Sequence, residues 1–280
     1  MVQIFNGGKE NMRSKSHNLL IGLVTGALLA ATLACGTGGV ASTPTAAIPP
    51  TDTFAPSQTP PPLFQSVTLT SVPAQETSTT PEYTVTAQTP ALQGSDDPRV
   101  LLFNNEMAQI TQQEIASFKD DARMVQAPPP GTPGSTYDQS FELLSPPGNL
   151  ISVKFSIMIY MARAAHPGTH SRTVTYDLQA GRDLALGDLF LPNSDYLDPI
   201  AAYCVAELQE RPIGFDPSMG GAQPTSSNYG NWNVSQDGLV ITFDEYQVAP
   251  YSSGPQVVVV PYSALTAVLD PNGPLAPLLP

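Results

Sequence analysis

The sequence contains only two cysteines, Cys35 and Cys204, among 280 residues. Because Cys35 falls at the end of the N-terminal segment discussed below, no intramolecular disulfide framework is expected. Cys204 is surrounded by small and aliphatic residues, which is typical of a buried hydrophobe rather than of a reactive thiol. We therefore expect a fold that depends on its apolar core.

Basic side chains are also scarce. The chain has 11 Lys and Arg against 24 Asp and Glu, a formal net charge of -13, and no Lys or Arg occurs between Lys15 and Arg99. Such a field repels phosphates and anionic headgroups, so it argues against nucleic-acid binding and favours a cationic partner or none. No nucleophile elbow, Walker loop, dinucleotide fingerprint or H-E-x-x-H motif occurs, which predicts a protein that is not an enzyme and needs no cofactor.

A membrane-length apolar run is absent as well. The longest, Leu19 to Ala34, follows a basic segment and falls short of the roughly 20 residues that span a bilayer, which predicts a signal peptide over residues 1–34. Thr32-Leu33-Ala34-Cys35 resembles the lipobox of bacterial lipoproteins, which implies a lipid on Cys35 and an exported protein on the outer face of the membrane or in the cell envelope. Thr32 stands where that family usually has leucine, so ordinary cleavage nearby and an uncleaved anchor stay open.

Residues 35–95 are rich in Thr, Pro, Ser, Ala and Gln. Proline removes backbone donors, and the scattered apolar residues show neither a period of 2 nor one of 3.6. The composition predicts a disordered tether.

Residues 96–270 show the patterns of a folded domain of the α+β class: a mainly antiparallel sheet with two or three packed helices, followed by a frayed Pro-rich tail over residues 271–280. A helix capped by Asn104 or Asn105 should run to about Arg123. Alternating residues predict a meander of three strands over 136–144, 150–163 and 170–178. A helix over 196–210, strands over 232–234, 239–243 and 256–260, and a short helix over 262–268 complete the prediction.

Three segments near the C-terminus resemble the closing motif of the RsiV-type extracellular domain family: Asp237 to Phe243, Tyr246 to Gly254 and Val260 to Leu265. Ala164 to Pro167 is similar to a turn of that family, and 176–190 to a further stretch. The similarity covers residues 150–270, and 97–163 is similar to the companion domain that usually precedes it.

The resemblance implies an extracellular domain like that of an anti-sigma factor that binds lysozyme, and like domains that accompany cell-wall polysaccharide deacetylases. Only 18 residues precede Leu19, so we expect neither a cytoplasmic sigma-binding domain nor a deacetylase domain. The expected function is a non-catalytic, membrane-tethered binding or sensing module for an extracellular protein, lysozyme-like proteins included, or for a cell-wall glycan. The alternatives are an accessory protein of a cell-wall hydrolase or deacetylase, and a structural envelope lipoprotein.

Aromatic residues supply the candidate binding site. Tyr and Trp are favoured at recognition surfaces, although packing of the same residues against the sheet is an equal alternative. His166 and His170 with Asp177 are spaced too loosely around a turn to predict a metal site. Asp244 and Glu245 should be solvated, since adjacent strand residues point to opposite faces. The predicted ligand-binding residues are His166, Trp232, Tyr246, Pro250, Tyr251 and Tyr262.

Overall fold

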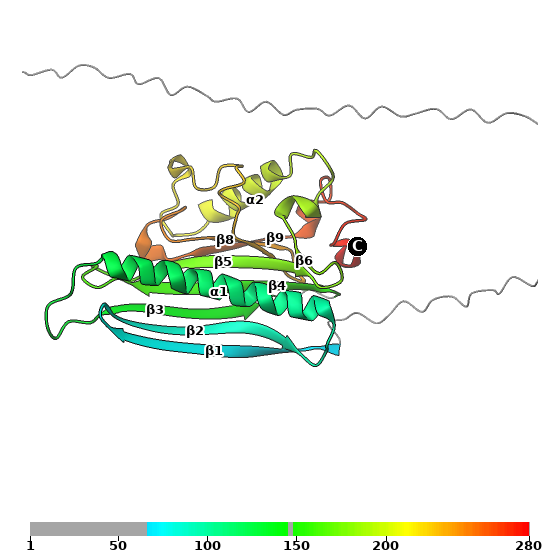
Figure 1. The fold of residues 1–280 in the computed structure, drawn as a ribbon. Helices are drawn as coiled ribbons and strands as arrows, with labels where there is room; N and C mark the ends of the chain where they lie inside the picture. The colour runs from blue at the N-terminus through cyan, green and yellow to red at the C-terminus, as the bar shows by residue number, and fades with distance from the viewer. Residues whose placement is uncertain (1–65, 145–147, 280) are drawn as a thin grey trace, which may run out of the picture. The chain divides into compact units, whose positions relative to one another are not determined.

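A helix of 27 residues lies across one face of a six-stranded sheet, and the C-terminal part of the chain packs beyond the strand β5 (Figure 1). The computed structural model describes residues 66–144 and 148–279. The predicted signal peptide, Cys35 and the first part of the predicted tether lie outside these residues. Neither α-helix in the described part of the chain is both long and apolar enough to cross a membrane.

The large sheet has the strand order β1-β2-β3-β4-β5-β6. All neighbours are antiparallel except β2 and β3, which are parallel because the helix α1 connects them. The predicted meander is confirmed as β3, β4 and β5. The elements of this half are β1 (Thr68–Thr79), β2 (Glu82–Gln93), α1 (Pro98–Met124), β3 (Ser135–Leu143), β4 (Leu150–Tyr160), β5 (Gly168–Asp177) and β6 (Arg182–Asp183).

The prediction that residues up to 95 form a disordered tether was wrong for 68–93, which form the β1–β2 hairpin. Tyr83, Val85 and Ala87 are buried and alternate with exposed residues, so a period of 2 was present. The Thr-rich composition concealed it, although threonine is a good strand former. The domain boundary predicted at residue 96 therefore falls inside the fold.

The helix α1 begins at Asp97, seven residues before the predicted cap. The Asp97 carboxylate accepts from the Arg99 backbone N–H at 2.9 Å, and Pro98 occupies the first turn. Asn104 lies inside the helix, where its side-chain amide exchanges two hydrogen bonds with the backbone of Leu92 in β2. The interior asparagine thus ties the helix to a strand.

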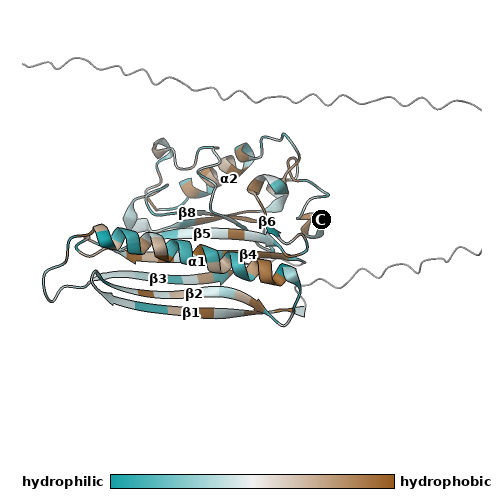
Figure 2. Cartoon of the chain, viewed as in Figure 1, coloured by the Kyte–Doolittle hydropathy of each residue, from teal (hydrophilic) through white to brown (hydrophobic). Residues whose placement is uncertain are grey.

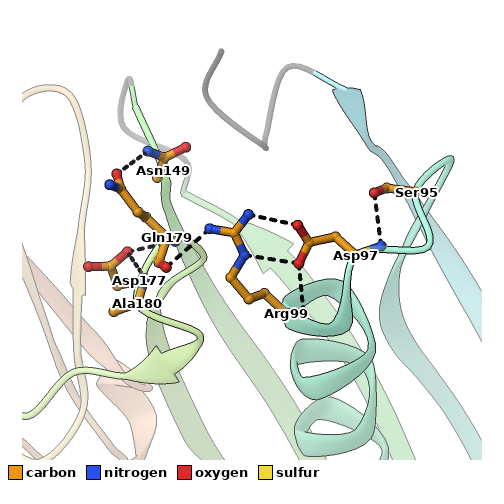
Figure 3. Close-up of polar contacts among 7 residues, drawn as sticks. All are labelled: Ser95, Asp97, Arg99, Asn149, Asp177, Gln179 and Ala180. Carbon is orange, nitrogen blue, oxygen red and sulfur yellow. Dashed lines mark hydrogen bonds and ion pairs between the residues drawn. The ribbon is translucent and has the colours of Figure 1, made fainter. Parts of the chain in front are cut away.

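A polar cluster fixes the start of α1 to the turn after β5 (Figure 3). The Arg99 guanidinium donates to Asp97 and to the backbone carbonyl of Gln179 at 3.2 Å. Its hydrogen bond lowers the pKa of Asp97 to about 2. Asp177 accepts from the backbone of Gln179 and Ala180 and so shapes this turn.

Hydrophilic and hydrophobic residues alternate along α1 (Figure 2), and its apolar side covers the sheet. Phe103 packs edge-on against Tyr176 of β5 at 5.3 Å, and Phe118 lies 5.5 Å from Tyr137 of β3. These contacts form the core of the first half.

The second half has its own core around the helix α2 and a three-stranded sheet, in the order β7-β8-β9. The α-helix and strand predictions are confirmed here, but only 262–264 of the predicted last helix are helical, as a short 3₁₀ turn. The elements are α2 (Leu197–Gln209), β7 (Trp232–Val234), β8 (Leu239–Phe243), β9 (Gln256–Val260) and 3₁₀ turns at Leu186–Leu189, Pro217–Met219, Tyr251–Ser253, Tyr262–Ala264 and Ala276–Leu278.

The predicted fraying of the tail from residue 271 was wrong for the described residues up to 279. Leu275 is 1% exposed and belongs to the second core, and Leu278 and Leu279 pack against it. Proline ends the regular structure here, but the leucines between the prolines still bury apolar surface.

Polar groups connect the two sheets. The Asn233 side chain of β7 donates to Ser152 Oγ at 2.9 Å and to the Val153 carbonyl at 3.0 Å, and Val234 N–H donates to the same hydroxyl. Ser152 also bonds Thr175 of β5. The second half is thereby held in register on β4 and β5.

Candidate functional site

Three of the predicted ligand-binding residues form a stack of rings on the surface. The His166 ring lies 4.0 Å from the Tyr251 ring at an interplanar angle of 28°, and Tyr251 lies 5.7 Å from Tyr246 at 26°. His166 and Tyr246 are exposed, and Tyr251 is half-buried. We call His166, Tyr251 and Tyr246 the aromatic stack.

The aromatic stack joins two segments that are 80 residues apart in sequence. The Tyr251 hydroxyl donates to the Pro167 carbonyl at 2.9 Å, and His166 Nδ1 donates to the same oxygen at 2.8 Å. The proton on Nδ1 leaves Nε2 of a neutral imidazole as an acceptor. One carbonyl therefore orients both rings.

Tyr246 has a backbone φ of 65°, in the left-handed region. This conformation costs a tyrosine about 1–2 kcal/mol and persists only where neighbours enforce it. Its side chain is 56% exposed despite that cost. Pro250 is also exposed and caps the 3₁₀ turn that carries Tyr251.

Gln247 holds the loop that presents the tyrosines. Its side chain donates to the carbonyls of Gly221 and Asn228 at 3.0 and 2.9 Å and accepts from the Asp244 N–H at 3.1 Å. A Cβ on Gly221 would lie 1.8 Å from the Gln247 carbonyl oxygen, so only glycine fits there. The sequence did not predict the role of Gln247, because a glutamine in a loop gives no periodic signal.

The two acidic residues after β8 bind the edge of β5. Asp244 accepts from the Ser171 N–H at 2.8 Å, and Glu245 accepts from the Thr169 N–H at 3.0 Å. Burial raises the pKa of Asp244 even though Ser171 and Asn231 bond it. The expectation that both were solvated was wrong, because the chain leaves the strand at Phe243 and both side chains turn toward β5.

His170 is paired with Glu114 of α1 at 3.3 Å. This hydrogen bond raises the pKa of His170 and lowers that of Glu114. Asp177 lies at the other end of β5, so His166, His170 and Asp177 are not brought together. Within residues 66–144 and 148–279, no group of three His, Cys, Asp or Glu residues could hold a metal ion.

Trp232 and Tyr262 do not join the aromatic stack. They are 7% and 6% exposed and belong to the second core, and the Tyr262 hydroxyl donates to the Ser235 carbonyl at 2.8 Å. Burial raises the pKa of Cys204, which is fully buried in that core as expected, to about 12. Tyr262 and Cys204 therefore pack in the core and do not line a surface site.

The second half carries a family signature. Residues 187–263 match the family model described as "Protein of unknown function (DUF3298)". The chain contains a DUF3298 domain. The match includes the stretches Asp237 to Phe243 and Tyr246 to Gly254, on which the family resemblance was predicted.

One curated protein is similar in sequence to part of this chain. The peptidoglycan-N-acetylmuramic acid deacetylase PdaC of Bacillus subtilis strain 168 is 27% identical over 122 residues, which cover 42% of this chain and 26% of that protein. The chain thus spans about a quarter of the length of the relative that it matches.

Two solved structures share the fold. A DUF3298 family member from Bacteroides fragilis NCTC 9343 matches with a TM-score of 0.56 at 18% identity, over 73% of this chain and 94% of that one. A DUF3298 family protein from Pseudomonas aeruginosa PAO1 matches with a TM-score of 0.53 at 15% identity, over 76% and 97%. Both likenesses extend well beyond residues 187–263, so the fold shared with these proteins includes part of the first half.

Proposed function

We propose that this protein is a non-catalytic recognition module, tethered outside the cell membrane through a lipid on Cys35, whose DUF3298 domain binds cell-wall glycan. The single observation that carries the proposal is the aromatic stack. Its two exposed rings, His166 and Tyr246, offer apolar surface to the apolar faces of sugar rings, and Tyr251 is stacked between them. The fold holds Tyr246 in this position although its left-handed backbone conformation is unfavourable.

The surroundings of the aromatic stack favour binding over catalysis. The carboxylates next to the stack, Asp244 and Glu245, accept hydrogen bonds from backbone N–H groups of β5, which assigns them to holding the loop. Tyr251 and His166 are fixed by Pro167. A rigid surface of this kind loses little conformational entropy when a ligand binds.

The ligand class is supported by the relative. PdaC, by its name, acts on N-acetylmuramic acid in peptidoglycan, so a domain shared with it would be suited to the same polymer. A basic protein such as a lysozyme is the other ligand class that a net charge of -13 favours. The two classes differ in salt dependence, because aromatic stacking on a neutral sugar is much less sensitive to salt than charge attraction.

The test is co-sedimentation of the full-length protein with purified, protein-free peptidoglycan at low and at high salt. We expect binding that persists at high salt and that falls about tenfold or more in Tyr251→Ala and in Tyr246→Ala. Tyr203→Ala, a partly buried tyrosine on α2 outside the stack, is the matched control. Binding that is equal in the stack variants and wild type would refute the proposal. In a parallel pull-down on immobilised lysozyme, capture that high salt abolishes, together with no binding to peptidoglycan, would replace the glycan with a basic protein.

The tether is tested separately by mass spectrometry of the protein recovered from membranes. We expect an N-terminal residue at Cys35 that carries a diacylglycerol. A mature chain that begins elsewhere without lipid would contradict this part of the proposal.

A further inference from the structure

A second concave site lies on β5, between α1 and the start of β7. It has a volume of about 240 Å³, just below the roughly 300–1,000 Å³ of typical small-molecule pockets. A ligand about the size of one sugar ring would fill it. We call it the Trp232 cleft; its lining includes Glu106, Gln109, Gln113, Arg172, Asp183 and Trp232.

The charged and amide side chains of the Trp232 cleft have no partner in the described part of the chain, whereas its threonine hydroxyls are bonded. Among the described residues, Glu106, Asp183 and Arg172 form no side-chain hydrogen bond or ion pair, and neither do Gln109 and Gln113, although these groups line one cleft. Elsewhere on the same two elements, Glu114 of α1 and Asp177 of β5 are bonded. Gln109, Gln113, Arg172 and Asp183 are exposed and Glu106 is half-buried, so water bonds these groups in the free protein and a polar ligand in the cleft would replace that water.

Trp232 provides an independent observation. It lines the cleft and is only 7% exposed, yet its indole N–H has no acceptor within residues 66–144 and 148–279. Among the described residues, the fully buried side-chain polar atoms without a partner belong to Asn149, Ser194, Asn233 and Thr242, so the Trp232 N–H is open to water although its ring is nearly buried. A ligand oxygen in the cleft would supply an acceptor.

The charges in the cleft favour a cationic group. Burial raises the pKa of Glu106, and the negative charge of Asp183 raises it further. The positive charge of Arg172 acts on Glu114, whose pKa it helps to lower. Arg172 lines the same cleft and Arg182 interacts electrostatically with Asp183, but neither forms an ion pair with Glu106 or Asp183, so an ammonium group between these two carboxylates would relieve their repulsion.

We propose that the Trp232 cleft binds one sugar residue that carries a free, protonated amino group. The carboxylates of Glu106 and Asp183 hold the ammonium, the Trp232 N–H donates to a ring substituent, and the amides of Gln109 and Gln113 bind hydroxyls. This inference rests on the proposed glycan function and adds the identity of one sugar residue, which the aromatic stack leaves open.

The two sites lie along one strand. Thr169, bound by the loop of the aromatic stack, and Thr173, which lines the cleft, are four residues apart on β5. At about 3.4 Å per residue this is about 14 Å. A short oligosaccharide can reach from one to the other.

Trp232 is the only tryptophan in the chain, so its fluorescence reports on this cleft alone. The full-length protein would be titrated with the tetramer of glucosamine, with the fully N-acetylated tetramer, and with pentalysine, at a pH where the amines are protonated. We expect a saturable fluorescence change with the glucosamine tetramer and binding at least about tenfold weaker with the acetylated one. Glu106→Gln and Asp183→Asn should each weaken glucosamine binding severalfold, whereas Asp121→Asn, an exposed acid on the same helix, should not.

Equal affinity for both tetramers, or no effect of Glu106→Gln and Asp183→Asn, would overturn the proposal. Pentalysine that binds as well as glucosamine would overturn the assignment to a sugar. Thermal unfolding of each variant shows whether it is folded, and calorimetric titration of Trp232→Phe tests the indole N–H without the fluorescence signal. If these titrations fail while co-sedimentation with peptidoglycan still depends on Tyr251, only this inference falls; if both fail, the proposed function falls too.

Discussion

The two halves of the described chain each have an apolar core, but they use their polar side chains differently. In the half built on α1, polar groups fasten regular elements to one another, as Asn104 does with Leu92 and Thr111 with Thr89. In the half built on α2, they fasten loops, as Gln247 does with Gly221. The first half is a scaffold that also supplies His166, and the second half presents Tyr246 and Tyr251 of the aromatic stack on it.

β5 is where the two halves meet. It receives α1 on one face through Tyr176 and His170, and it binds the second half through the Thr173 side chain and the Ser171 backbone N–H. The aromatic stack and the Trp232 cleft both lie along this strand. The difference between the halves can therefore be tested by weakening the scaffold and the loops separately.

The largest expected effect follows from removing the β1–β2 hairpin. A chain that begins at Asp96 loses the buried Tyr83, Val85 and Leu92, each of which contributes roughly 1.5–3 kcal/mol on burial. The sum is on the order of 6 kcal/mol, comparable with the whole stability of a domain. We expect this fragment not to unfold cooperatively in urea, as followed by circular dichroism.

A chain that begins at Ser66 is the control and should unfold cooperatively. Equal unfolding midpoints for the two fragments would show that the hairpin is not part of the folded domain, as the composition of 35–95 had suggested.

The next effect concerns the loop of the aromatic stack. Gly221→Ala places a methyl group against the Gln247 carbonyl, and we expect it to destabilise the protein by about 1–3 kcal/mol and to weaken peptidoglycan binding as the loop shifts. Gly230→Ala is the matched control, since its Cβ would meet nothing closer than 3.7 Å. Similar unfolding free energies for the two variants would contradict the role assigned to Gln247.

The smallest effect is expected at the His170–Glu114 pair. The pKa of His170 is raised above its usual 6.5, so its contribution is complete below about pH 6.5 and is lost as the pH rises through the raised value. The pKa of Glu114 is lowered below 4.5, so its contribution is present above about pH 4.5 and is lost as the pH falls through the lowered value.

Glu114→Gln should therefore cost most between about pH 4.5 and 6.5, by less than about 1 kcal/mol because the pair is partly exposed. Arg172 beside Glu114 and Asp244 beside His170 also act on the pair. The measurement is the His170 pKa by NMR together with unfolding at several pH values. A pKa unchanged by Glu114→Gln would disprove the coupling.

Local patterns predicted the second half well. The strands 232–234, 239–243 and 256–260 alternate or follow a turn signal such as Asp237-Gly238, and α2 stops before Pro212. The β1–β2 hairpin was missed because its polar face and its prolines dominate the composition. Its pairing with β3 also depends on α1 crossing between them, which no local pattern contains.

Some residues of the two candidate sites were predicted from the sequence and others were not. The aromatic residues around Tyr251 were visible in the sequence, and the structure brings two of them together with His166. Trp232 was grouped with them but lies in another cleft, and Glu106 and Asp183 were not predicted at all. They are 77 residues apart and meet only because α1 and the β5–β6 turn lie side by side.

The most direct test of the central claim is to map a soluble, uncrosslinked peptidoglycan glycan onto the domain by NMR. If the aromatic stack binds glycan, backbone amide shifts will concentrate at 166–170 and 246–252, and will disappear in Tyr251→Ala while the rest of the spectrum is unchanged. Shifts confined to the β1 edge or to α2, or none at saturating glycan, would contradict the account.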